Sequence, residues 1–304
     1  MERPTSSLRQ WQSSGGFTGQ AAPGIEQEAV DFYDHYVRHL VFTDLCFPFP
    51  GHEGPGLLSF EPVALTPPFL SLIIPAHNEE NRLPRALGQA FAFLENQNYA
   101  AEVVVVENAS SDRTLEVAKK FARDFPNLLV LHENQSGKGR ATRRGVLEAH
   151  GEYRFIADTD FSMPVEEINR FLPPACSFDI TIASREAPGA IRYHEPAYRH
   201  LTERVYNYFI RSLILPGLQD TQCGFKCFRA TVAEDIFRFQ TLTGWSFDVE
   251  LLAIARQHGY TIKEIGIPWY YNAGSKVNVL RDSLRMFLDL LVIRRNARRG
   301  VYDA

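Results

Sequence analysis

The fold of this chain follows from one stretch, Val103-Val104-Val105-Val106-Glu107-Asn108. Four consecutive valines predict a strand covered on both faces, because a strand with one wet face would alternate apolar and polar residues. Other short apolar runs bounded by polar turns are Leu72–Pro75, Leu128–Leu131, Arg154–Ala157 and Ile180–Ser184. Apolar residues recur at helical spacing between the early runs, as at Leu83, Leu87, Phe91 and Leu94. The alternation predicts an α/β fold with a Rossmann-like, mostly parallel sheet flanked by helices.

The 304 residues divide into four segments of different composition. Residues 1–24 are rich in Ser, Gly, Gln and Pro, and we expect them to be disordered. Residues 25–68 combine a helical pattern with a connector punctuated by Pro and Gly, which predicts an N-terminal extension. The sheet pattern predicts one large domain over 69–295, followed by a basic tail over 296–304.

Composition and charge exclude some classes of protein. The chain is 45% hydrophobic with a formal net charge of −4, so it has ample material for a core and no general attraction for nucleic acid. No secretory signal is visible. The sequence has no run of about 18 apolar residues, so we expect no membrane-spanning helix. We therefore expect a cytoplasmic protein that is soluble or lies on the cytoplasmic face of a membrane.

Polar clusters follow the strands, and in a parallel sheet ligands bind beyond the carboxyl ends of the strands. The first strand runs into Pro75-Ala76-His77-Asn78-Glu79-Glu80, and the second ends in Glu107-Asn108. The amide of Asn108 offers both a donor and an acceptor, which suits the edge of a uracil. The alternative for both clusters is a strand-to-helix turn with a helix N-cap.

Two further clusters suit a phosphate and a metal ion. Gly137-Lys138-Gly139-Arg140 opens a predicted helix, where glycines allow close backbone approach and the cations suit a diphosphate. Asp158-Thr159-Asp160 comes directly after a hydrophobic strand. Its two crowded carboxylates repel each other unless a cation joins them, so they predict a divalent metal site that bridges to a diphosphate. A solvated acidic turn is the alternative.

The second half carries three more candidate segments: Gln222-Cys223-Gly224-Phe225-Lys226, Trp245 to Glu250, and Gly274-Ser275-Lys276 after an expected strand Ile265–Tyr271. Asp248 and Glu250 are two residues apart and cannot share one helix face. We expect only Asp248 to point into a site, where it could act as a base or orient an acceptor.

Taken together, these residues resemble family 2 glycosyltransferases, which have the GT-A fold, and in particular dolichyl-phosphate β-glucosyltransferases and polyprenyl-phosphate relatives. The resemblance runs from Leu70 to Arg295. Its most specific stretches are Asp220-Thr221-Gln222-Cys223-Gly224-Phe225-Lys226-Cys227-Phe228, Trp245 to Leu252, and Gly274-Ser275-Lys276-Val277.

The resemblance implies roles for individual positions. Those matching the nucleotide-sugar site are Pro75, Ala76, Glu79, Asn108, Lys138, Asp158, Arg199 and Gln222. Asp160 matches the principal ligand of Mg²⁺ or Mn²⁺, with Asp158 as its neighbour in the metal site. Arg185 and Lys276 match cations that hold the diphosphate and the acceptor phosphate, as does Arg199. The family usually has two aspartates where this chain has Glu107-Asn108, and many relatives carry membrane helices that this sequence does not show.

The implied reaction is the inverting transfer of a hexose, in the first place glucose, from a UDP-sugar to a polyprenyl or dolichyl phosphate. Two alternatives stay open. The same fold could transfer to a soluble or glycan hydroxyl, with Asp248 as base. A protein of another class would bind nucleotide sugars without catalysis.

The C-terminal helix offers a route to a membrane. Leu280, Leu284, Phe287, Leu288 and Leu291 fall at helical spacing and form one apolar stripe. From Lys276 to the end, seven Lys and Arg stand against three Asp. An apolar stripe with a basic end suits a helix in the headgroup layer of an anionic membrane, and the alternative is a helix docked on the large domain.

Overall fold

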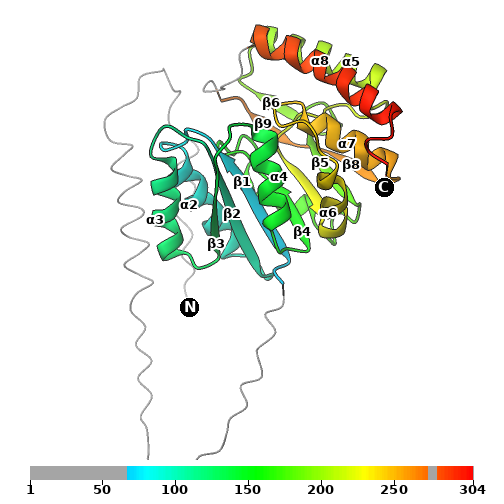
Figure 1. Ribbon diagram of the computed structural model, residues 1–304. Coiled ribbons are helices and arrows are strands. Elements are labelled where there is room, and N and C mark those ends of the chain that lie inside the picture. Colours follow the sequence, from blue (N-terminus) through cyan, green and yellow to red (C-terminus); the bar gives the residue numbers. More distant parts are fainter. Residues whose placement is uncertain (1–66, 273–278, 304) are drawn as a thin grey trace, which may run out of the picture. The chain divides into compact units, whose positions relative to one another are not determined.

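The computed structural model of this chain describes residues 67–272 and 279–303, and for 279–284 only the backbone. The predictions for residues 1–24, for 25–66 and for Lys276 lie outside the described residues. The described residues comprise the large domain and the helix that follows it (Figure 1).

Seven strands form the main sheet, in the order β3-β2-β1-β4-β7-β5-β8. Their bounds are β1 Leu70–Ala76, β2 Ala101–Asn108, β3 Leu128–Glu133, β4 Tyr153–Ile156, β5 Ile180–Ser184, β7 Lys226–Arg229 and β8 Ile262–Gly266. β7 is antiparallel to its neighbours β4 and β5, and the other pairs are parallel. The expected mostly parallel sheet is therefore confirmed.

Helices cover both faces of this sheet (Figure 1). Their bounds are α2 Leu83–Leu94, α3 Thr114–Asp124, α4 Lys138–Glu148, α5 Ala197–Leu213, α6 Ala230–Arg238, α7 Phe247–Gln257 and α8 Val279–Arg298, with a 3₁₀ turn, η1, over Val165–Phe171. α4 packs on β1 and β2 with α6 and α7 beside it, while α2, α3 and η1 pack together on the other face. Val103 to Val106 are fully buried between these layers, which is why that stretch has no polar residue.

The expected strand Ile265–Tyr271 is divided in two. β8 ends at Gly266, and β9, Pro268–Tyr270, pairs with β6, Ile191–Tyr193, in a second, two-stranded sheet. A Cβ at Gly266 would lie 2.4 Å from the carbonyl oxygen of Pro188, so only glycine fits where the two segments meet. Proline at the start of β9 lacks the N–H that would continue the ladder.

The end of the chain packs against the large domain. α8 continues to Arg298, and Tyr302 is fully buried, its hydroxyl 2.8 Å from Oε1 of Glu250. Among the described side chains of α8, Leu290 and Ile293 are buried, whereas Leu288 and Leu291, in the predicted stripe, are 53% and 48% exposed. Over its described side chains the helix is therefore docked through positions other than Leu288 and Leu291. Among the described helices, none has the length and apolar character needed to cross a bilayer.

Candidate active site

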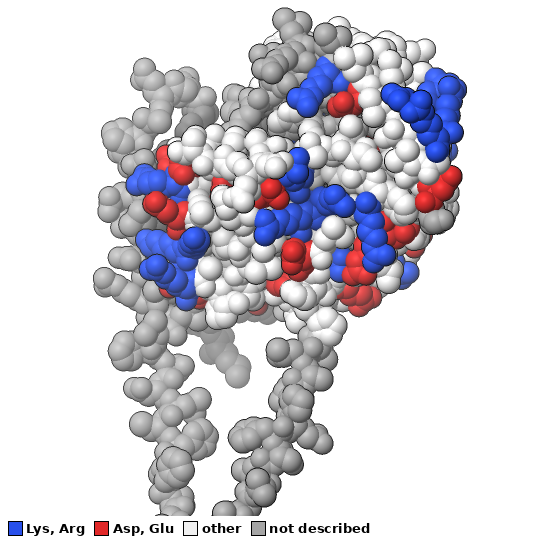
Figure 2. Space-filling model, in the orientation of Figure 1, with Lys and Arg blue, Asp and Glu red and all other residues white. Residues whose placement is uncertain are grey.

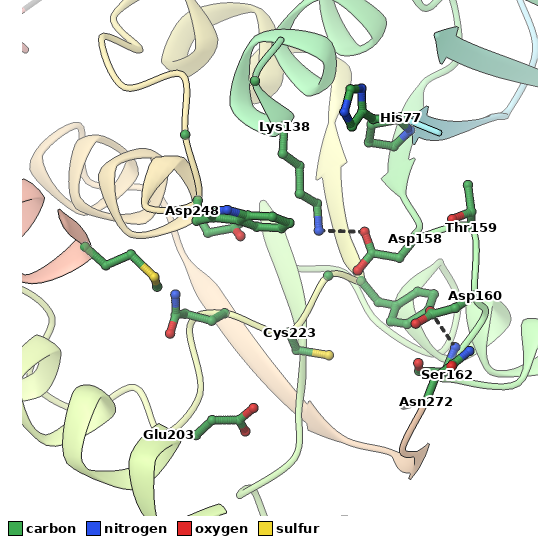
Figure 3. Close-up of a pocket in the computed structure, with 18 of the residues that line it drawn as sticks. His77, Lys138, Asp158, Thr159, Asp160, Ser162, Glu203, Cys223, Asp248 and Asn272 are labelled. Carbon is green, nitrogen blue, oxygen red and sulfur yellow. Dashed lines mark hydrogen bonds and ion pairs between the residues drawn. The ribbon is translucent and has the colours of Figure 1, made fainter. Parts of the chain in front are cut away.

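The carboxyl ends of the parallel strands meet at one edge of the sheet, where a cavity of about 700 Å³ opens (Figure 3). It is lined by eleven of the predicted site residues: Pro75, Ala76, Glu79, Asn108, Lys138, Asp158, Asp160, Arg185, Arg199, Gln222 and Asp248. Three loops after strands and the segments around α5 and α7 thus converge on one hollow, as expected for an α/β sheet.

Asp158 and Asp160 lie on the wall of the cavity directly after β4. Oδ1 of Asp158 is 2.6 Å from Nζ of Lys138, at the start of α4, and Oδ1 of Asp160 accepts a 3.1 Å hydrogen bond from the backbone N–H of Ser162 (Figure 3). Lys138 therefore neutralises the first carboxylate, and the second has no cationic partner among the described residues.

The electrostatics of this pair favour a cation. Burial raises the pKa of Asp160, and the charge of Asp158 raises it further. Burial alone would lower the pKa of Lys138, but the carboxylates of Asp158 and Asp248 outweigh it, so the net pKa is raised and the lysine stays charged. Carboxylate oxygens are the ligands that Mg²⁺ and Mn²⁺ prefer, so Asp160 offers a suitable donor. The described residues contain no cluster of three or more potential ligands, so a bound ion would take its other ligands from the diphosphate and water.

Gly224 keeps Asp158 in place. A Cβ at Gly224 would lie 1.9 Å from Oδ2 of Asp158, so the backbone of the loop before β7 lies directly against this carboxylate. Any larger residue would displace Asp158 from Lys138. This contact explains why the loop that carries Gln222 needs a glycine beside the acidic pair.

The end of the cavity at β1 and β2 carries an unsatisfied polar group. Asn108 is 4% exposed, and its Oδ1 atom is buried without a hydrogen-bond partner in the described chain. The helix that follows is capped at Arg113, so Asn108 is not its N-cap. Likewise Asn78 is not the cap of α2, because its Oδ1 atom accepts a hydrogen bond from Ser111 N–H and joins the two loops. Buried polar atoms are normally paired, so the free Asn108 oxygen suits a ligand.

Arg185 lies in the cavity wall with its donors already engaged. Its Nε and Nη2 atoms form a bidentate pair with Asp220 at 2.7 and 3.0 Å, and Nη1 is 2.9 Å from Glu203. Burial opposes these charges, but the carboxylates prevail: the pKa of Arg185 is raised and that of Asp220 is lowered. Arg199 also contacts Glu203, at 3.5 Å. No motif in the sequence marks Glu203, which lies between the two predicted phosphate-binding cations.

Asp248 faces the cavity and Glu250 does not. Oδ1 of Asp248 is 2.9 Å from Nζ of Lys226, a lysine 1% exposed. Glu250 is fully buried and accepts hydrogen bonds from the backbone N–H groups of Thr241 and Leu242. It therefore fixes the loop before α7, which forms part of the cavity wall.

Several cavity residues were not predicted as site residues. Examples are Glu203 and Tyr206 from α5, Trp245 and Trp269, and Arg285 and Asp289 from α8. Trp245 lies in one of the candidate motifs of the sequence, whereas no motif marks Glu203 and Tyr206 in α5 or Arg285 and Asp289 in α8. Nζ of Lys138 lies 5.6 Å from the centre of the Trp245 ring, so this tryptophan supports the lysine that holds Asp158.

Comparison with solved structures supports the fold. Glucosyl-3-phosphoglycerate synthase from Mycobacterium tuberculosis in complex with uridine diphosphate is 17% identical with a TM-score of 0.54, covering 75% of this chain and 80% of that one. A complex of the same enzyme with Mn²⁺, uridine diphosphate and glucosyl-3-phosphoglycerate also has a TM-score of 0.54. At this identity the likeness concerns the fold alone.

Sequence relatives are closer. The dolichyl-phosphate β-glucosyltransferase of Homo sapiens is 33% identical over 242 residues, and that of Dictyostelium discoideum 30% identical over 242 residues. Each alignment covers 74% of this chain and 74% of the relative. The family model described as glycosyl transferase family 2 matches residues 71–237, which include the strand-end clusters and the acidic pair. The chain therefore belongs to glycosyl transferase family 2.

Proposed function

We propose that this protein transfers glucose from UDP-glucose to a polyprenyl or dolichyl phosphate, with inversion at the anomeric carbon. The observation that carries the proposal is the acidic pair Asp158 and Asp160, set in a cavity at the carboxyl edge of the sheet in a chain related to dolichyl-phosphate β-glucosyltransferases. Peripheral contact with the cytoplasmic face of a membrane is part of the same proposal.

Asp160, with Asp158 beside it, would hold Mg²⁺ or Mn²⁺. When bound there, the ion supplies positive charge that stabilises the departing nucleoside diphosphate. Lys138 orients Asp158 through their ion pair and adds positive charge to the same region. Asn108 would take the edge of the nucleobase, together with the backbone around Pro75 and Ala76.

The pairing of Asp248 bears on the choice between a phosphate and a hydroxyl acceptor. A hydroxyl acceptor needs a general base, and Asp248 was the candidate. Burial raises the pKa of Asp248, but its carboxylate is bound to Lys226, whose buried charge would lose its carboxylate partner if Asp248 took up a proton. A phosphate monoester has a second pKa of about 6 and is mostly ionised at neutral pH, so it needs little help from a base.

The direct test is a transfer assay. We expect UDP-glucose with Mg²⁺ or Mn²⁺ to give glucosyl polyprenyl phosphate, detected by mass, and other nucleotide sugars to give less. Product on a soluble or glycan hydroxyl, with none on lipid phosphate, would favour the alternative acceptor. UDP-glucose binding with neither transfer nor hydrolysis would indicate a non-catalytic binding protein.

Asn108→Ala tests recognition of the donor. We expect the variant to bind UDP more weakly by about 1–3 kcal/mol, because the amide pairs with the base in a desolvated pocket. Calorimetry with UDP measures the effect, and Asn127→Ala, at an exposed asparagine before β3, is the control. Equal affinity of Asn108→Ala and wild type would remove Asn108 from the donor site, and tighter binding of GDP than UDP would overturn the choice of nucleotide.

A further inference from the structure

Large apolar side chains gather on the outer surface of two neighbouring helices. We call this surface the apolar face; it consists of Leu201, Val205 and Tyr208 on α5 and Leu288, Leu291 and Val292 on α8. These side chains are 39% to 65% exposed. Contiguous apolar surface of this kind is uncommon on soluble proteins and marks contact with a protein, a ligand or a membrane.

The two helices pack directly against each other. The rings of Phe209 on α5 and Phe287 on α8 are 5.3 Å apart, and the Tyr206 hydroxyl donates a 3.0 Å hydrogen bond to the backbone carbonyl of Met286. The inner sides of both helices are occupied by fully buried residues such as Ile210 and Leu290. The exposed residues therefore face outward because the inward positions are already filled.

Charge at the end of the apolar face indicates what covers it. Four exposed arginines lie at the C-terminal end of α8 and in the turn that follows it: Arg294, Arg295, Arg298 and Arg299. Within the described part of the chain none of them has an acidic partner. In Figure 2, blue side chains gather at this end of α8, next to a largely white surface. An apolar surface with a cationic border matches the boundary between acyl chains and anionic headgroups.

The apolar face borders the candidate active site. Tyr198, Thr202 and Tyr206 from α5, and Arg285 and Met286 from α8, line the cavity. Arg285 is an exposed cation of the cavity wall, and it has no carboxylate partner among the described residues. A phosphate approaching from the α5–α8 side would thus meet a free guanidinium.

We propose that the apolar face and the four arginines bind the surface of an anionic bilayer, with the mouth of the cavity beside the headgroup layer. One consequence of this proposal rests on the proposed function: a membrane-embedded phosphate acceptor would enter the cavity past Arg285. Binding to the bilayer itself is independent of the reaction.

Vesicle sedimentation tests the surface. We expect wild type to sediment with vesicles of phosphatidylcholine and phosphatidylserine, and less with phosphatidylcholine alone or at high salt. In one variant, Leu201, Val205, Leu288 and Leu291 are changed to Ser. We expect its partition coefficient onto the vesicles to fall by about ten-fold or more, because the apolar side chains that insert into the bilayer are lost. Changing the four arginines to Ser should remove the difference between the two lipids.

The matched control is Leu147→Ser with Phe178→Ser, two apolar side chains that are 38% and 42% exposed outside α5 and α8. It should sediment like wild type. All these substitutions are at exposed positions, and thermal unfolding checks that each variant folds. The proposal is overturned if wild type does not sediment, if the variant of the apolar face sediments equally well, or if ultracentrifugation shows that this face joins two copies of the chain.

Transfer assays separate this proposal from the proposed function. With UDP-glucose, the variant of the apolar face should retain wild-type transfer to a short, water-soluble isoprenyl phosphate and lose most transfer to polyprenyl phosphate in vesicles. Equal loss with both acceptors would show a damaged site and overturn the proposed role of the surface in acceptor entry. If wild type sediments with the vesicles but transfers glucose to neither acceptor, the proposed function is refuted, while the proposal that this surface binds a membrane is still supported.

Discussion

Asp160→Asn should fold like wild type and lose turnover by on the order of 100-fold, or about 3 kcal/mol, by analogy with the loss of one preorganised stabiliser of developing charge. The amide keeps the shape of the side chain and can still accept the hydrogen bond from Ser162 N–H. It removes the one carboxylate of the acidic pair that no described lysine or arginine neutralises. Single-turnover transfer from UDP-glucose measures the loss.

A binding measurement separates the metal from other roles of Asp160. In wild type we expect Mn²⁺ to tighten UDP binding, and in Asp160→Asn we expect this increment to disappear while metal-free binding persists. Asp124→Asn, at an exposed position at the end of α3, is the control and should change neither quantity. Near-normal turnover by Asp160→Asn, with an unchanged response to Mn²⁺, would exclude Asp160 as the metal ligand.

Asp220→Asn is expected to reduce the free energy of unfolding by about 3 kcal/mol, because it breaks a buried bidentate ion pair and leaves the buried Arg185 charge with one carboxylate in place of two. Asp220 is fully buried and bidentate to Arg185, whose remaining carboxylate partner is Glu203. The control is Glu167→Gln, which removes an ion pair with Arg170 at the surface and should cost about 1 kcal/mol or less. Urea unfolding near neutral pH compares the variants.

The same substitution has a pH signature. Arg185 holds the pKa of the Asp220 carboxyl below its usual range despite burial, so the carboxylate stabilises the fold above the unfolded pKa of about 4. That contribution is lost as the pH falls toward the folded pKa. Asp220→Asn should therefore lose less stability than wild type on acidification below about pH 4. Parallel acid-unfolding curves for the two proteins would contradict the buried pair.

The sequence by itself determined the class of fold and the composition of one side of the site. Val103 to Val106 predicted a strand buried on both faces, and the helical spacing between the strands predicted parallel crossovers. Since parallel strands end at a common edge, the clusters at Pro75, Asn108 and Asp158 had to converge there. These inferences are local, because the periodicity of a strand and the polar residues at its end both depend on residues that are adjacent in the sequence.

Only the tertiary structure decided which charges remain free for a ligand. Arg185 is one of the cations assigned to phosphate, but Asp220, 35 residues away, and Glu203 occupy its donors. Asp248 is bound to the buried Lys226.

The tertiary structure also decided which side of α8 is buried. The stripe predicted from spacing includes Leu288 and Leu291, yet Leu290 and Ile293 fill the interior. An amphipathic pattern gives the period of a helix, but the side that meets the core depends on the shape left by elements distant in sequence. Ion pairs and helix docking are contacts between such distant elements, and no local pattern encodes them.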